Sequence, residues 1–157
     1  MNAKTKAIAL VSGGLDSALA VAVVKRLGVD VLALHVIIGY SPAFMQREVA
    51  GESPADLAAE EAVRMSAAFG VPVRMLDVTE EYFDVLLHPR HGYGANANPC
   101  IDCHLFMIRK AKEVMDREGA RFVFTGEVLG QRPMSRTTRR SSSSIASAAS
   151  RGCFFAP

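Results

Sequence analysis

The stretch that decides the fold is Ala7-Ile8-Ala9-Leu10-Val11-Ser12-Gly13-Gly14-Leu15-Asp16-Ser17. Its first five residues are all apolar, which is typical of a strand buried on both faces of a parallel sheet. Two glycines follow, and the residues from Leu15 to Leu27 predict a helix that ends at Gly28. A buried strand, a glycine turn and a helix in this order predict an anion-binding loop at the end of the strand.

The rest of the chain repeats this alternation of strand and helix. We expect further strands at residues 31–38, 71–78 and 121–125, and helices at residues 54–69, 80–87 and 99–118. Strands that alternate with helices of this length predict an open parallel sheet with helices on both faces, so the chain is assigned to the α/β class. The pattern does not predict the order of the strands.

The charges are distributed unevenly along the 157 residues. All 16 acidic residues lie at or before Glu127, whereas four of the 18 basic residues lie in residues 136–157. Residues 1–135 therefore hold 14 basic and 16 acidic residues, a net charge of −2, which gives no support to a nucleic-acid-binding surface there. No apolar run is long enough for a membrane span and the first residues lack a signal-peptide core, so we expect a cytoplasmic protein.

Residues 136–157 differ in composition from the residues before them. They are rich in serine and arginine and contain no acidic residue, a composition typical of disordered segments. We therefore expect one domain at residues 1–135, followed by a tail. Because the α/β pattern stops after the fourth strand, we also expect that the chain is truncated, or read out of frame beyond Ser135.

The glycine turn has the residues of a phosphate site. Gly13 and Gly14 can take positive φ angles, so that consecutive backbone N–H groups point into one concavity, and the start of the helix adds partial positive charge. Ser12 and Ser17 can donate their hydroxyls to phosphate oxygens, and Asp16 can hold Mg²⁺. The turn lacks the lysine of a Walker loop, so it is not a P-loop of that type. It is also not Gly-x-Gly-x-x-Gly, which disfavours a dinucleotide-binding fold.

A second motif, Asn98-Pro99-Cys100-Ile101-Asp102-Cys103-His104, opens the helix predicted at residues 99–118. Asn98 suits the N-cap, and the two cysteines, three residues apart, share one face near the positive helix end. This position favours a reactive thiolate, and the same spacing supplies half of a zinc or iron–sulfur site. The alternative is a pair of packed thiols. Nearby residues that could complete a zinc site are His88, His91 and His104.

The loop resembles that of the PP-loop ATP pyrophosphatases, whose pattern is Ser-Gly-Gly-x-Asp-Ser. The resemblance implies a Rossmann-like nucleotide-binding HUP fold and cleavage of ATP between its α and β phosphates. Pyrophosphate then lies on residues Ser12–Ser17, including Leu15, and AMP passes to a substrate. The adenine lies against the backbone at the end of the second strand, which corresponds here to Leu34, His35 and Val36. No role is assigned to the imidazole ring.

Two further segments resemble tRNA thiolation enzymes. Asn-Pro-Cys-x-x-Cys is similar to the segment of the tRNA 2-thiouridylases that carries their first catalytic cysteine. Gly126-Glu127-Val128-Leu129-Gly130-Gln131 is similar to a segment of the tRNA 4-thiouridine synthetases, which implies that Gly126 and Glu127 close over the nucleotide. The resemblance covers about residues 6–135. The chain departs from the 2-thiouridylase pattern at Ala97 and His104, and it ends before the position of their second catalytic cysteine.

The resemblance implies adenylation of a tRNA uracil oxygen with ATP and Mg²⁺, followed by sulfur transfer. Cys100 then carries a persulfide that Cys103 resolves, or both cysteines bind an iron–sulfur cluster such as 4Fe–4S. Expected partners are tRNA, a sulfur donor protein or sulfide, and a second copy of the chain, with no membrane. Two alternatives stay open: a PP-loop ligase or amidotransferase that adenylates a carboxylate, and an ATP-binding module without catalysis.

Overall fold

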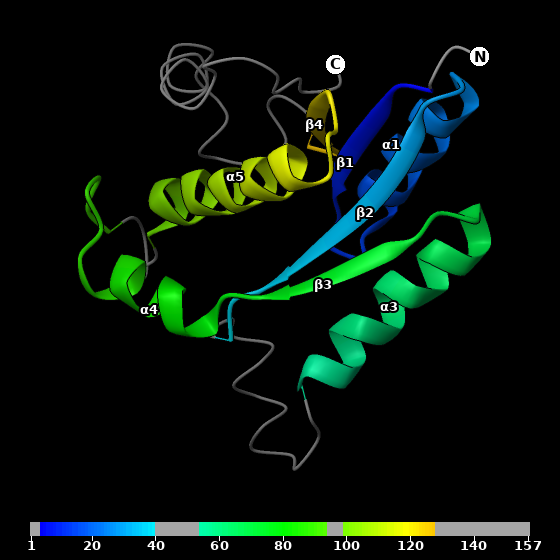
Figure 1. Ribbon diagram of the computed structural model, residues 1–157. Coiled ribbons are helices and arrows are strands. Elements are labelled where there is room, and N and C mark those ends of the chain that lie inside the picture. The colour runs from blue at the N-terminus through cyan, green and yellow to red at the C-terminus, as the bar shows by residue number, and fades with distance from the viewer. Residues whose placement is uncertain (1–3, 40–53, 94–98, 128–157) are drawn as a thin grey trace.

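The computed structural model describes residues 4–39, 54–93 and 99–127, and its strands and helices alternate as the sequence predicts (Figure 1). Each element begins and ends within two residues of its prediction, and the helix predicted from Pro99 begins at Cys100 because Pro99 is its N-cap. The elements are β1 (Lys6–Leu10), α1 (Leu15–Arg26), β2 (Asp30–Ile37), α3 (Pro54–Phe69), β3 (Val73–Asp77), α4 (Thr79–Leu87), α5 (Cys100–Arg117) and β4 (Phe122–Thr125).

The strands form a parallel sheet of four in the order β3-β2-β1-β4. Strand β1 lies inside the sheet, where Ala9 pairs with Ala33 on one side and with Phe124 on the other. Two neighbours and two covered faces explain why residues 7–10 of the strand are all apolar. The predicted α/β class with an open parallel sheet is confirmed.

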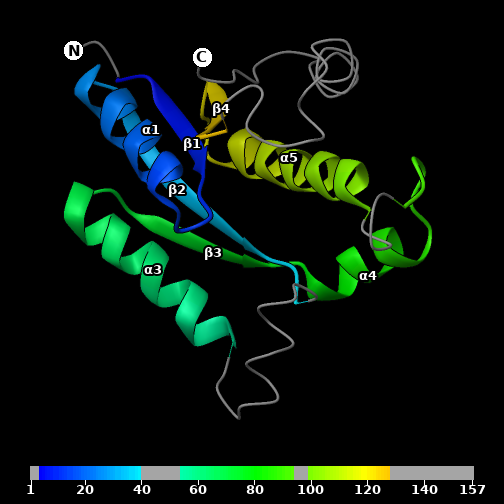
Figure 2. The ribbon, with the colours of Figure 1, turned by 180° about the vertical axis from the view of Figure 1, so that it is seen from behind.

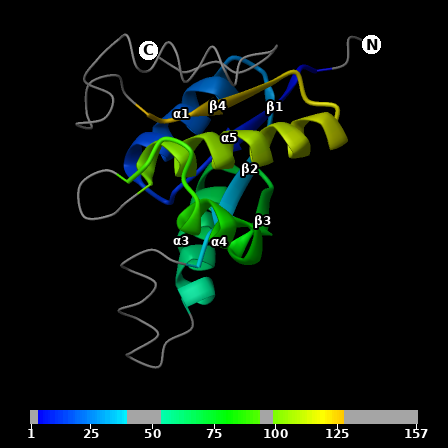
Figure 3. The same cartoon turned by 90° about the vertical axis from the view of Figure 1, so that its left-hand side faces the viewer.

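Alternate residues of β1 face two different core clusters, because successive side chains of a strand point to opposite faces. Ala7 and Ala9 pack with α1 and α3, whereas Ile8 packs with the apolar face of α5. Figures 1 and 2 show α1 and α3 on one side of the sheet and α4 and α5 on the other, the side from which Figure 3 is viewed. The prediction of helices on both faces is therefore also confirmed.

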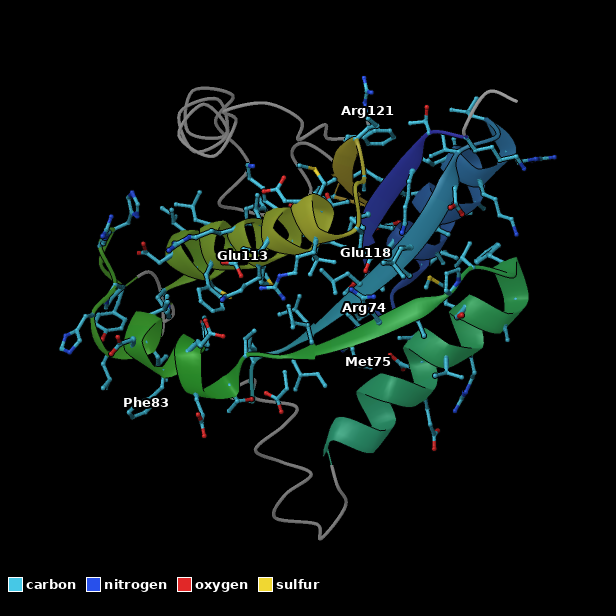
Figure 4. The ribbon with its side chains drawn as sticks, viewed as in Figure 1. Arg74, Met75, Phe83, Glu113, Glu118 and Arg121 are labelled. Carbon is cyan, nitrogen blue, oxygen red and sulfur yellow. The ribbon has the colours of Figure 1, made fainter. Side chains whose placement is uncertain are left out.

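An ion cluster ties the amino ends of the strands together. Glu118, just after α5, pairs with Lys6 of β1 and with Arg74 of β3, each at 2.6 Å. Figure 4 shows Arg74 and Glu118 pointing toward one another. The hydrogen bonds from the Lys6 and Arg74 side chains hold the pKa of Glu118 below its usual range. This end of the sheet therefore holds structural charges.

The opposite end of the sheet holds the residues that the sequence marks for function. The chain leaves β1 toward β2 and later returns to β4 on the other side of β1, so the order of the strands reverses there. In open α/β sheets, ligands bind outside the carboxyl ends of the strands at such a switch point.

Within the described residues, no helix is long and apolar enough to cross a membrane.

Candidate functional site

The turn between β1 and α1 is built on one left-handed glycine. Gly13 has φ of 80°, in the region that favours glycine. Gly14 has φ of −76° and ψ of 161°, so the prediction of a positive φ there is wrong. The reason is that Gly14 is the N-cap of α1, where an extended backbone lets its carbonyl accept the hydrogen bond from the N–H of Ala18 at 3.2 Å.

The hydroxyls and the carboxylate of the turn differ in exposure. Ser17 is buried, and its Oγ donates a hydrogen bond to the carbonyl of Gly14 at 2.7 Å. This bond closes the turn from inside, and a phosphate contact of Ser17 stays a prediction. Ser12 and Asp16 are exposed, with Asp16 in the first turn of α1. Ser12 and Asp16 can therefore reach a ligand from the solvent side, while the buried Ser17 hydrogen bond holds the turn in place.

Gly126 connects the turn to the end of β4. A Cβ placed on Gly126 would lie 2.5 Å from the backbone of Asp16 and Ser17, so the two segments touch backbone to backbone. The next residue, Glu127, places its carboxylate 3.4 Å from the ring nitrogen Nε2 of His104 on α5. The structure thus brings the glycine turn, the segment after β4 and the start of the cysteine helix together, although the turn lies more than 80 residues before the other two in the sequence.

The ring of His35, for which sequence reasoning assigned no role, supports the residue before the turn. His35 is buried near the end of β2, and its Nδ1 lies 3.0 Å from the carbonyl oxygen of Val11. Burial lowers the pKa of His35, so the ring is neutral near pH 7 and donates its Nδ1–H to that carbonyl. Leu34 is fully buried and Val36 is half-buried. The predicted adenine contacts of these residues stay predictions.

Sequence reasoning missed Glu61 as a neighbour of the turn. This residue of α3 lies so close to the turn that a Cβ on Gly13 would meet its Oε2 at 2.6 Å. Its charge also acts on His35, where it opposes the effect of burial on the pKa. Nothing in the local sequence distinguishes Glu61 from other helix-surface acids, because its position depends on how α3 crosses the sheet.

The two cysteines lie in the first turn of α5, both reduced and half-buried. Their surroundings differ. Cys103 packs against the cluster of Val78, Tyr82 and Phe106. Burial, together with a hydrogen bond to the Cys103 side chain, raises the pKa of the Tyr82 hydroxyl. Asn98, the expected N-cap, lies outside the described residues, and Pro99 caps the helix without a side-chain hydrogen bond.

Asp102, between the cysteines, anchors the preceding loop to α5. It is buried, and its two carboxylate oxygens accept hydrogen bonds from the backbone N–H and the ring Nδ1 of His91 at 2.9 and 2.8 Å. Burial opposes ionisation, but the hydrogen bonds from His91 outweigh it and hold the pKa of Asp102 below its usual range. Sequence reasoning missed this contact because it joins residues 11 apart across a loop.

The described residues contain no group of three side chains that could hold a metal ion. Two of the histidines considered as zinc ligands contact carboxylates, since His91 bonds Asp102 and His104 faces Glu127. An iron–sulfur cluster needs at least one ligand beyond the cysteine pair, and the described residues supply none there. The described residues around the cysteine pair therefore do not fit an iron–sulfur cluster. A single Mg²⁺ held mainly by phosphate oxygens fits the exposed carboxylate of Asp16.

The sheet, the switch point and the Ser-Gly-Gly-Leu-Asp-Ser turn define a PP-loop nucleotide-binding domain of HUP type. Residues 5–141 match the family model described as tRNA methyl transferase HUP domain, and the chain belongs to this family. The resemblance to PP-loop ATP pyrophosphatases, with the tRNA thiolation enzymes among its relatives, is confirmed.

Curated relatives are named as tRNA thiolation enzymes. The chain is 29% identical over 102 residues to the tRNA-specific 2-thiouridylase MnmA of a Thermotoga species, a match that covers 61% of this chain and 28% of the relative. It is 27% identical over 137 residues to the protein of that name from Rhizobium rhizogenes, covering 82% of this chain and 33% of the relative. The chain thus spans about a third of the length of these relatives.

Solved structures agree on the fold. A 4-thiouridine synthetase in complex with RNA and bound ATP superposes with a TM-score of 0.65 at 22% identity, covering 96% of this chain and 36% of that one. A predicted subunit of tRNA methyltransferase from Methanocaldococcus jannaschii superposes with a TM-score of 0.58 at 16% identity, covering 96% and 67%. At these identities the likeness supports the fold alone.

Proposed function

We propose that the Ser12–Ser17 loop binds Mg·ATP and that the domain transfers AMP to a uracil oxygen of tRNA, as the first step of tRNA thiolation. The observation that carries the proposal is the contact of Gly126 with the backbone of Asp16 and Ser17. It joins the PP-loop to the segment that resembles the 4-thiouridine synthetases, and Glu127 extends this site to the cysteine helix. The names of the curated relatives supply the substrate class.

Adenylation uses groups that the loop presents. A uracil carbonyl oxygen attacks the α-phosphorus of ATP, the bond from that phosphorus to the bridging oxygen breaks, and pyrophosphate leaves. The N–H groups of Gly13 and Gly14 and the start of α1 stabilise the charge on pyrophosphate, because oriented donors act most strongly where charge develops. Asp16 is the residue that would hold Mg²⁺, which neutralises phosphate charge. The oxygen, now esterified to AMP, is a good leaving group.

Sulfur transfer would then use the cysteine pair. The terminal sulfur of a persulfide on Cys100 attacks the activated carbon, and AMP leaves. The thiolate of Cys103 attacks the Cys100 sulfur and releases the thiolated base, which leaves a disulfide between the two cysteines. A thiol reductant must reduce that disulfide before the next turnover. Cys103, packed against Tyr82, suits the resolving position better than the first position, which needs access to a sulfur donor.

The family description names methyl transfer, but the site favours the thiolation chemistry of the curated relatives. Methyl transfer from a sulfonium donor uses no phosphate loop and no cysteine pair. A ligase or amidotransferase that adenylates a carboxylate would use the loop, but its reaction would not require the two cysteines. The sulfur donor, a homo-oligomeric state and a cytoplasmic location stay predictions.

Titration calorimetry and a pyrophosphate-release assay test the first step. The wild-type chain should bind ATP in the presence of Mg²⁺, and uracil-containing tRNA should stimulate pyrophosphate release. Asp16→Ala should weaken Mg·ATP binding by about 1–3 kcal/mol, the range for losing a charge-assisted contact. Asp30→Ala, which removes an exposed carboxylate at the other end of the sheet, is the matched control and should bind normally. Equal affinities of Asp16→Ala and wild type would refute the assignment of Asp16.

A further inference from the structure

The carboxylate of Glu61 lies against the phosphate loop. Glu61 belongs to α3, which covers the same face of the sheet as α1. A methyl-sized atom on Gly13 would lie 2.6 Å from the Oε2 of Glu61 and 3.0 Å from its Cβ. The whole side chain therefore lies over Gly13 rather than extending past it, and the loop keeps this arrangement only with glycine at that position.

The carboxylate has no partner among the described residues, in contrast to its neighbour. Glu60 pairs with Arg64 at 2.9 Å, on the exposed side of the same helix. Glu61 forms no hydrogen bond or ion pair within the described part of the chain. Its charge also acts on the buried ring of His35, which is bonded to the carbonyl of Val11 immediately before the loop. Among the described residues, nothing at the loop forms an ion pair with the negative charge of Glu61.

A carboxylate at this position affects an incoming nucleotide through its charge. The loop is only six residues long, so phosphates bound on it lie well within the Debye length, about 8–10 Å at ordinary salt, of a group that touches Gly13. Metal-free ATP brings its full negative charge to that carboxylate. Mg·ATP carries two fewer negative charges, and its Mg²⁺ can be coordinated by a carboxylate oxygen. The same side chain therefore opposes one form of the nucleotide and favours the other.

We propose that Glu61 makes the loop selective for magnesium-complexed ATP over metal-free ATP. This inference rests on the proposed function, because it assumes that the loop binds ATP. Glu61 is exposed, so water screens its charge, and two unit charges about 4 Å apart in water change a binding constant by up to about tenfold. We therefore expect Glu61 to raise the ratio of the Kd of metal-free ATP to the Kd of Mg·ATP by a factor of about ten.

The experiment measures both dissociation constants by calorimetry at one ionic strength, with ATP in excess Mg²⁺ and with ATP in EDTA. Glu61→Gln should lower the ratio of the two constants about tenfold, chiefly by tightening the binding of metal-free ATP. Glu61→Asp, which keeps the charge, should retain most of the selectivity. Glu60→Gln, which removes the neighbouring charge, should have the ratio of the wild type. Thermal unfolding of each variant establishes that it is folded.

The outcomes separate this inference from the proposed function. If wild type binds ATP and Glu61→Gln shows the wild-type ratio within twofold, Glu61 does not select the ionic form and the inference is overturned while the proposed function stands. A lowered ratio in Glu60→Gln as well would mean that the general charge of α3 is responsible, which also overturns it. If wild type binds neither form of ATP, both the proposed function and the inference fail.

Discussion

The glycine turn and the cysteine helix lie at the same end of the sheet but are held in place by different means. The turn is fixed by backbone geometry, through the left-handed Gly13, the N-cap carbonyl of Gly14 and the close approach of Gly126. The start of α5 is fixed by side chains, through the contact of Asp102 with His91 and the packing of Cys103. Substitutions of glycine should therefore perturb the turn most, whereas substitutions of side chains should perturb the start of α5 most.

The largest expected effect separates the two regions by their chemistry. Cys100→Ser should abolish sulfur transfer and leave the Kd of Mg·ATP within twofold of wild type, because adenylation uses only the loop whereas transfer needs the thiol. Thiolation is measured as incorporation of labelled sulfur into tRNA, and ATP binding by calorimetry. Cys153→Ser, at a cysteine outside both motifs, is the matched control and should behave as wild type.

Alkylation gives an independent measurement of the same difference. Cys100 should react with iodoacetamide faster than Cys103, because Cys103 packs against Tyr82 and Phe106. Mass spectrometry of partly alkylated protein identifies which thiol reacts first. Wild-type thiolation by Cys100→Ser would eliminate Cys100 as the sulfur carrier, and a faster reaction at Cys103 would exchange the roles of the two cysteines.

The next effect tests whether the turn depends on its backbone contact. Gly126→Ala should destabilise the fold by about 1–3 kcal/mol, the usual cost of overpacking, because the new Cβ would lie 2.5 Å from the backbone of Asp16 and Ser17. It should also weaken ATP binding, since the turn must shift. Gly14→Ala is the matched control: φ there is negative, and the nearest atom to a new Cβ, Ser12 Oγ, is 3.6 Å away.

Denaturant unfolding and calorimetry measure the two consequences separately. Gly14→Ala should lose only about 1 kcal/mol, because alanine is a poorer N-cap than glycine, whereas Gly126→Ala should unfold at a clearly lower midpoint. Equal midpoints for the two variants would show that the segment after β4 does not pack on the turn. The contact that carries the proposed function would then be lost as well.

The sequence predicted the fold and the glycine turn more completely than the side-chain contacts that surround the turn and the cysteine helix. Apolar runs, glycine stops and the Ser-Gly-Gly-Leu-Asp-Ser turn are local signals, because strand burial and positive φ depend on nearby residues. The positions of Glu61 and His91 depend on how separate elements cross, which no short pattern records. The strand order was unreadable for the same reason, and the error at Gly14 arose because a Gly-Gly pair does not show which glycine is the helix cap.

The smallest expected effect concerns His35, whose side chain bonds to the carbonyl of Val11 just before the turn. The folded state lowers the pKa of this ring, so the unfolded chain binds a proton more readily than the folded protein. The contribution of His35 to the free energy of unfolding should therefore be complete above the ordinary pKa of about 6.5 and should decline as the pH falls below it, by at most about 1.4 kcal/mol per pH unit. The side-chain amide of His35→Gln can still donate a hydrogen bond toward the Val11 carbonyl. In this variant the decline at low pH should disappear, and the free energy of unfolding at pH 8 should change by less than about 1.5 kcal/mol. Denaturant unfolding between pH 5 and 8 measures both quantities, and His88→Gln, at an exposed histidine, should keep the wild-type slope. If His35→Gln instead loses stability equally at every pH, the ring acts only through its hydrogen bond to Val11, and its buried neutral state contributes nothing to the pH dependence.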